Sequence, residues 1–126
     1  MPWGYHLILD CADCDSSIDD KEVIERFAVD LVKRIDMIAY GDPIIEYFGT
    51  DNKSGYSLVQ LITTSSITAH FASEVKEIYL DVFSCKPFDA NIVQDCVKYY
   101  FGAKYINATY LERNAPSNEN KESEEY

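Results

Sequence analysis

Three side chains with reactive or titratable groups lie close together in the middle of the chain. Ser65 carries a hydroxyl, His70 is one of only two histidines, and Cys85 carries a thiol. Imidazole has an ordinary pKa near neutrality, so His70 is suited to act as a general base toward a hydroxyl or a thiol. The segment therefore contains the groups needed for nucleophilic or acid–base chemistry.

The same residues also have a purely structural interpretation. Ser65 follows two threonines and precedes a second serine, as in a hydroxyl-rich strand end. His70 would then be a hydrogen-bonded, partly buried histidine, and Cys85 a small core residue. Composition and spacing by themselves favour this interpretation.

Familiar catalytic and binding motifs are absent from the sequence. It contains no G-x-S-x-G, P-loop, dinucleotide-binding, H-E-x-x-H or EF-hand pattern. Cys11 and Cys14 have a C-x-x-C spacing, but no second pair completes a zinc site. We therefore expect no metal centre and expect reduced thiols in a cytosolic protein.

The net charge narrows the possible partners. A formal charge of −11 argues against nucleic acid and anionic membranes, and it is compatible with a small cationic substrate. An alternative is that the acidity simply keeps the chain soluble. The sequence has no apolar run of membrane-spanning length and no signal-peptide core, so we expect a cytoplasmic protein.

The residue pattern predicts two helices and six strands. An apolar stripe at helical spacing over residues 23–35 predicts a helix that begins at Asp19. A second helix is expected between Asp89, its cap, and Gly102, where it ends. Apolar and β-branched runs predict strands at residues 5–11, 44–48, 56–64, 67–71, 78–84 and 104–110, with a corner at Ser65 and Ser66.

This order of elements predicts an α+β fold. We expect a two-layer sandwich in which two helices cover one face of a mainly antiparallel sheet. Residues 1–111 would form a single domain, followed by an acidic, disordered tail over residues 112–126. On a regular strand Ser57 and Ser65 would point the same way, and together with His70 and Cys85 they could converge on one site.

The segment from Ser57 to Cys85 resembles the small prokaryotic-type S-adenosylmethionine decarboxylases, which make their own pyruvoyl cofactor. The resemblance runs through this segment without a gap and extends more loosely over residues 5–110. The opening GYHLILD is similar to the family's first strand, and DVFSC is similar to its strand that ends in a catalytic cysteine. Five residues match the family at fixed spacing: Ser57, Ser65, His70, Glu74 and Cys85.

The resemblance implies self-processing between Thr64 and Ser65. The Ser65 hydroxyl would attack the Thr64 carbonyl and convert the peptide bond into an ester. His70 would act as the base with help from Ser57, and β-elimination would then split the chain. The second fragment would begin with a pyruvoyl group derived from Ser65.

The resemblance also implies the later chemistry. The pyruvoyl group would form a Schiff base with S-adenosylmethionine and withdraw electrons as carbon dioxide leaves, and Cys85 would return a proton. Glu74 would bind the ribose, and Phe48 is a candidate aromatic contact. The product would supply aminopropyl groups for polyamine (spermidine) synthesis, and the processed protomers would pair as a homodimer.

Two other functions stay open at this point. The same pyruvoyl chemistry would serve another amino acid, such as arginine or ornithine. Alternatively, the chain would be an unprocessed relative that binds a ligand without catalysis.

Overall fold

The computed structural model of the chain describes residues 1–117, so most of the predicted tail lies outside the described residues. The elements, in chain order, are β1 (Gly4–Ala12), the short 3-10 helix η1 (Ser16–Asp19), α1 (Lys21–Arg34), β2 (Ile44–Phe48), the 3-10 turn η2 (Asp51–Lys53), β3 (Gly55–Ile62), β4 (Ser65–Ala72), β5 (Glu77–Ser84), α2 (Ala90–Phe101) and β6 (Tyr105–Arg113).

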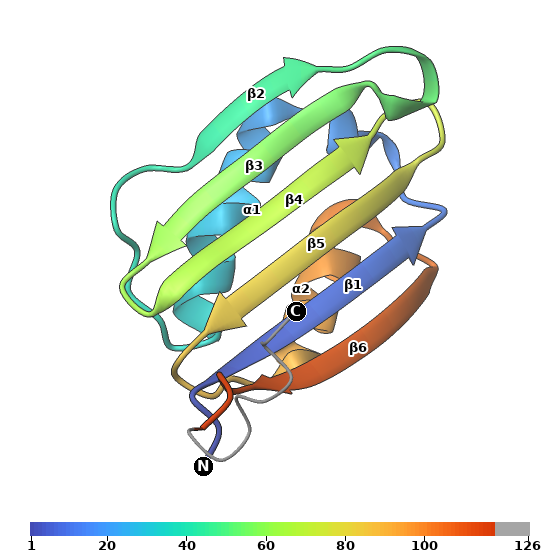
Figure 1. Cartoon of the computed structure of the whole chain (residues 1–126). Helices are drawn as coiled ribbons and strands as arrows, with labels where there is room; N and C mark the ends of the chain where they lie inside the picture. The colour runs from blue at the N-terminus through green and yellow to red at the C-terminus, as the bar shows by residue number, and fades with distance from the viewer. Residues whose placement is uncertain (118–126) are drawn as a thin grey trace.

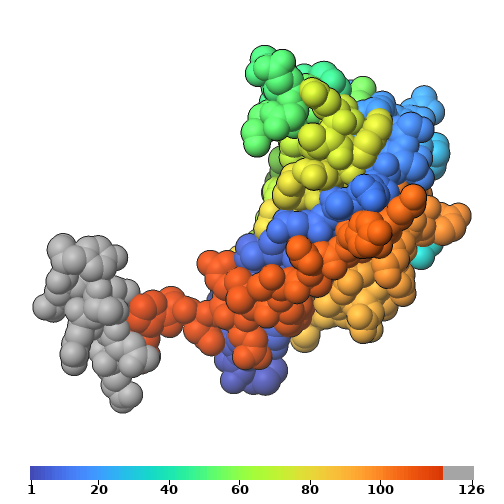
Figure 2. All heavy atoms as spheres, turned by 90° about the vertical axis from the view of Figure 1, so that its right-hand side faces the viewer, coloured from blue at the N-terminus to red at the C-terminus, as the bar shows by residue number. Residues whose placement is uncertain are grey.

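The strands form one antiparallel sheet that has a helical layer on a single face. Their order in the sheet is β2-β3-β4-β5-β1-β6, and each neighbouring pair is antiparallel. Figure 1 looks onto the uncovered face, with α1 and α2 behind the sheet. Figure 2 gives the side view, in which the uncovered face is hollowed between the segment near residue 50 and strand β6. The predicted two-layer α+β sandwich is confirmed.

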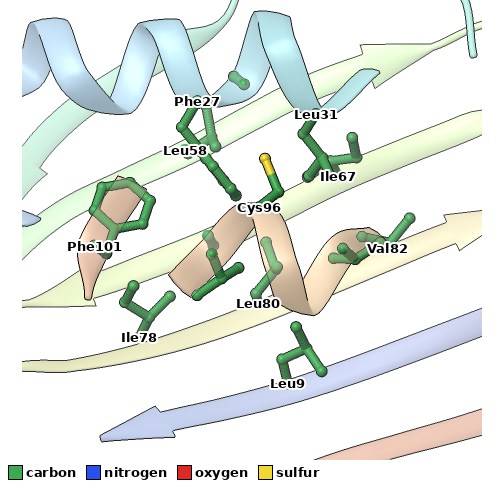
Figure 3. Packing of buried hydrophobic residues seen from close by; sticks show 14 of the residues in the cluster. Leu9, Phe27, Leu31, Leu58, Ile67, Ile78, Leu80, Val82, Cys96 and Phe101 are labelled. Atoms are coloured by element: carbon green, nitrogen blue, oxygen red, sulfur yellow. The ribbon is translucent and has the colours of Figure 1, made fainter. Parts of the chain in front are cut away.

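The core lies between the sheet and the two helices. Alternate strand residues such as Leu9, Leu58, Ile67 and Leu80 are buried because they face the helical layer. In Figure 3 the Cys96 side chain of α2 lies between the labelled residues of α1 and the sheet. The helical stripes predicted from the sequence supply the opposite wall of this core, from residues that include Ile24, Phe27, Leu31, Val93, Val97 and Phe101.

The helix ends agree with the predicted caps, with one shift. Asp89 caps α2, and Gly102 ends it in the left-handed conformation. Helix α1 is capped by Asp20, whose carboxylate accepts from the backbone N–H groups of Glu22 and Val23. Asp19, the predicted start, belongs to η1 instead, the short helix whose Ile18 is part of the buried core.

Two other boundaries also differ from the predictions. Strand β3 ends at Ile62, and Ser65 is already the first residue of β4, so the corner falls at Thr63 and Thr64. Strand β6 continues to Arg113 because it pairs with β1 as far as Gly4, so residues 112 and 113 belong to the sheet and not to the tail.

No helix in the described part of the chain is long and apolar enough to cross a membrane.

Gly55 is required where β3 begins. Its φ is +153°, and an added Cβ would lie 1.8 Å from the carbonyl oxygen of Phe71 on β4. We therefore predict that Gly55→Ala lowers the free energy of unfolding by about 3 kcal/mol, because the clash is with backbone that cannot move aside. Urea denaturation followed by circular dichroism measures the change.

Gly41→Ala is the matched control for this prediction. Gly41 also has positive φ, +76°, but an added Cβ would have no neighbour within 4 Å. The control should cost about 1 kcal/mol from the backbone conformation alone. Equal losses in the two variants would contradict the assigned clash.

Candidate active site

The β3–β4 hairpin places Ser65 in a strained conformation. Ile62 pairs with Ser65, which leaves Thr63 and Thr64 as the two turn residues. Tight two-residue turns usually accommodate their twist with positive φ at glycine or asparagine. Here the positive φ falls on Ser65, at +158°, a region that residues with a side chain rarely occupy. Such a conformation costs about 1–3 kcal/mol and is supported by the two strands that flank β4.

The peptide bond before Ser65 is held by the end of β5. The backbone N–H of Cys85 donates to the Thr64 carbonyl oxygen at 3.2 Å. The hydroxyl of Ser84, which is fully buried, donates to Thr64 Oγ1 at 2.8 Å and accepts from the backbone N–H of Lys86. A donor on this carbonyl stabilises negative charge that develops on its oxygen when a nucleophile attacks its carbon.

His70 lies at the other end of β4 and forms two hydrogen bonds. Its Nε2 lies 2.7 Å from the backbone oxygen of Lys53, which can only accept, so Nε2 carries the proton. In neutral His70, Nδ1 is therefore unprotonated and accepts from the Ser57 hydroxyl at 2.8 Å. Ser57 and His70 are register partners on β3 and β4, which explains why they meet.

Phe48 and Glu74 lie toward the same end as His70. The Phe48 ring, 57% exposed at the end of β2, has its centroid 6.4 Å from that of His70. Glu74 is exposed in the turn between β4 and β5. His70, Lys53 and Tyr79 also border a shallow hollow of about 180 Å³.

The structure does not bring all the predicted residues together in one chain. Ser65 and His70 are five residues apart on the same strand, which corresponds to about 17 Å. Ser65 lies with Cys85 at one end of the sheet, while Ser57 and His70 lie at the other end. In Figure 1 these are the two ends of the β4 arrow. The expected convergence of Ser57, Ser65, His70 and Cys85 is therefore wrong for a single chain, because the extended strand separates them.

Three groups at the site were not singled out in the sequence. Ser84 is a buried serine that anchors Thr64, and its only signal was its position beside Cys85. Met37 Sδ lies 3.4 Å from Thr64 Oγ1 and comes from the loop after α1, which gave no signal. The Lys53 carbonyl is a backbone group, which sequence patterns do not reveal.

The four cysteines have different surroundings. Cys85 is exposed, whereas Cys11, Cys14 and Cys96 are buried, and none of the four is in a disulfide. Burial raises the pKa of Cys11 and of Cys96 to about 12 and that of Cys14 to about 11. The interpretation of Cys85 as a small core residue is therefore wrong. Among the described residues no group of three or more His, Cys, Asp or Glu side chains is arranged to hold a metal ion.

Thiol alkylation tests this difference. With iodoacetamide at pH 8 we predict that the native chain is modified at Cys85 alone, because the other thiols are buried and remain protonated. Peptide mass spectrometry locates the modification, and denatured chain should react at all four cysteines. A native Cys85→Ser variant that reacts as fast as the unchanged protein would contradict the prediction.

Comparisons with known proteins agree with this architecture. The structure is similar to the crystal structure of the adenosylmethionine decarboxylase from Aquifex aeolicus VF5, with 24% sequence identity, 93% of this chain and 95% of that chain covered, and a TM-score of 0.77. No match was found among the curated proteins. The sequence model of one family, S-adenosylmethionine decarboxylase, matches residues 5–114. Because that match covers nearly all of the described residues, the chain belongs to the S-adenosylmethionine decarboxylase family.

Proposed function

We propose that the chain is a self-processing, pyruvoyl-dependent decarboxylase of S-adenosylmethionine that supplies the aminopropyl donor for polyamine (spermidine) synthesis. The proposed substrate, S-adenosylmethionine, follows from membership of the family. One observation carries the processing chemistry: Ser65 is strained directly after a carbonyl that accepts a hydrogen bond from the Cys85 N–H. The catalytic cysteine expected for the family is thus beside the bond that must be cut.

The processing step uses groups of the chain itself. Ser65 Oγ bonds to the Thr64 carbonyl carbon while the C–N bond breaks, and the hydroxyl proton passes through a base to the released nitrogen. The Cys85 N–H stabilises the intermediate oxyanion, and relief of the positive φ at Ser65 favours bond breaking. Loss of the Ser65 α-proton expels the Thr64 carboxylate. Water then replaces the nitrogen at residue 65, which leaves a pyruvoyl group and ammonia.

The surroundings of residue 65 fit a pyruvoyl group. The residue begins a strand beside the exposed thiol of Cys85, so the new chain end would stay anchored by β4 and open to a substrate. The group supplies a ketone that reacts with an amine and takes up the electrons released with carbon dioxide. The Cys85 thiol would return a proton at that position.

A complete site requires a second copy of the chain. His70 and Ser57 lie about 17 Å from Ser65, yet both sit on the uncovered face of the sheet. If two copies pack these faces together around a two-fold axis, the His70 end of each lies over the Ser65 end of the other. Two identical sites result, each completed by the partner's base. Phe48 and Glu74 would then contact substrate from the same subunit as His70.

The uncovered face has the composition of an interface. Its strands expose several large apolar side chains, which a single chain leaves in contact with water. They come from four strands across the sheet: Ile44, Phe48, Leu61, Tyr79 and Leu111. Burial of these side chains between two sheets supports the homodimer.

Intact mass and a denaturing gel test the cleavage. The purified chain should separate into residues 1–64 and 65–126, and the second fragment should be lighter by one ammonia than a hydrolytic fragment. Ser65→Ala should remain a single chain because it lacks the attacking hydroxyl. Ser66→Ala is the matched control and should still be cut. An uncut wild-type chain would rule out the proposed processing.

Mixed dimers test the shared site. His70→Ala and Cys85→Ser should each lose carbon dioxide release from labelled S-adenosylmethionine by at least about a hundredfold. Coexpression of the two variants should restore about a quarter of the wild-type activity, because half of randomly formed dimers carry one intact site. The control is coexpression of His70→Ala with Ser57→Ala, in which neither kind of site has an intact pair. Failure of the first mixture to regain activity would contradict a site made from two subunits.

A further inference from the structure

We propose that Arg113 binds the α-carboxylate of the substrate, in a hollow that adjoins the Ser65 end of the sheet. The inference rests on the proposed function for its choice of ligands, but it concerns a residue to which the resemblance assigned no role. The hollow has a volume of about 530 Å³ and is lined by Trp3, Phe83, Arg113, Asn114 and Ala115.

The Arg113 guanidinium is held in place on the uncovered face. Its Cζ lies 5.2 Å from the centroid of the Phe83 ring, and Nη1 donates to His6 Nδ1 at 3.3 Å. Because His6 Nδ1 accepts from Arg113, Nε2 carries the proton and donates to Asp81 at 2.9 Å. This chain of contacts orients the guanidinium while most of its N–H donors are still free for a ligand.

The N-terminal segment also packs against Phe83. The Trp3 ring stacks on Phe83 with centroids 6.0 Å apart and planes at 29°. The Trp3 backbone N–H donates to the Arg113 carbonyl and to Asn114 Oδ1. The hollow therefore combines aromatic walls with one oriented cation.

Among residues 1–117, Arg113 differs from Lys86, a second cation near this end, in having no anionic partner. Lys86 follows Cys85 directly, but its Nζ already contacts the carboxylate of Asp36 at 3.0 Å and its carbonyl at 2.6 Å. No carboxylate within residues 1–117 forms an ion pair with Arg113. In a chain of net charge −11, a guanidinium that has no ion pair within the described residues is a local site for a negatively charged group.

The position of the hollow identifies that negative group. Phe83 lies two residues before Cys85 and pairs with Ser66, so the hollow adjoins the end of the sheet that holds residue 65. An amino acid that binds with its nitrogen at residue 65 would carry its α-carboxylate on the adjacent carbon. A carboxylate in the hollow would then make a bidentate contact with N–H donors of Arg113 that its contact with His6 does not use. S-adenosylmethionine, arginine and ornithine all carry this carboxylate, so the proposal does not depend on which of them is used.

Arg113 is a substrate-binding residue in this proposal. The carboxylate loses its charge as carbon dioxide leaves, so a guanidinium contact is stronger in the bound substrate than in the transition state. Replacement of Arg113 should therefore raise KM and should not lower kcat.

Ligand binding tests the proposal independently of catalysis. In uncleavable Ser65→Ala protein, calorimetry compares each of the three amino acids with the amine that it becomes when it loses carbon dioxide. Arg113→Gln should weaken binding of an amino acid by about tenfold and leave binding of its amine within about twofold. Arg113→Lys should fall between, because it keeps the charge without the planar fork. Arg34→Gln, which removes an exposed cation paired with Asp30 on α1, should change neither ligand.

The proposal would be overturned if Arg113→Gln weakened the binding of the amino acid and of its amine equally, or if it changed neither affinity. It would also be overturned if no amino acid bound at all. If circular dichroism shows that Arg113→Gln does not fold, the same comparison is made between wild type and Arg113→Lys. An unchanged ratio of the affinities for the amino acid and its amine would then overturn the proposal. If the wild-type chain proves uncut but binding still depends on Arg113 for the amino acid and not for its amine, the proposed function is refuted and the α-carboxylate site is retained.

Discussion

The register of β4 between β3 and β5 is the constraint on which this structure depends. It pairs Ile62 with Ser65 on one side and Ser65 with Ser84 on the other, so the Thr64–Ser65 bond must lie at the end of β5. The same register pairs Ser57 with His70 five positions further along. A shift by one residue would exchange the two faces of β4 and lose both arrangements together.

The core beneath the sheet stabilises this register. Ile67, Ala69 and Phe71 of β4 alternate toward the helices, and Ser66, Thr68 and His70 alternate away from them. The buried set can pack against α1 and α2 in only one phase, and that phase directs His70 to the uncovered face. Packing energy thus supports the positive φ of Ser65, which a free hairpin would relax.

The polar and reactive groups of the proposed site lie at the two ends of the sheet. One end has Ser65, Cys85 and the Arg113 hollow, and the other has Phe48, Ser57 and His70. The end with Ser65 and Cys85 lacks the proposed base His70, and the end with Ser57 and His70 lacks the bond to be cut. The exposed apolar side chains between the two ends are most easily explained by a second sheet that packs against them. In the proposed dimer this division would link oligomerisation to chemistry, because an isolated chain holds the Thr64–Ser65 bond without His70 nearby.

Hydrophobic periodicity predicted nearly all of the fold, because burial of one face repeats every two residues in a strand and every 3.6 in a helix. It predicted β2 at its observed bounds, the Asp89 cap and the stripe from Ile24 to Ile35. It failed where long-range pairing decides the outcome. The hairpin turns at Thr63 and Thr64 because β4 must match both neighbours, and β6 reaches Arg113 because β1 offers it a partner as far as Gly4.

The sequence by itself determined which chemical groups the proposed site contains, since the spacing of Ser57, Ser65, His70 and Cys85, on which the resemblance to the family rests, does not depend on the fold. Only the tertiary structure decided which of them meet. Antiparallel pairing brings together residues distant in sequence, such as Ser65 and Ser84, while an extended strand holds Ser65 and His70 apart at about 3.3 Å for each residue between them. For the same reason Arg113, expected in a tail, lies over Phe83 beside the candidate active site. Closeness along the chain and closeness in space are different quantities in a β-sheet, and only the second allows side chains to react.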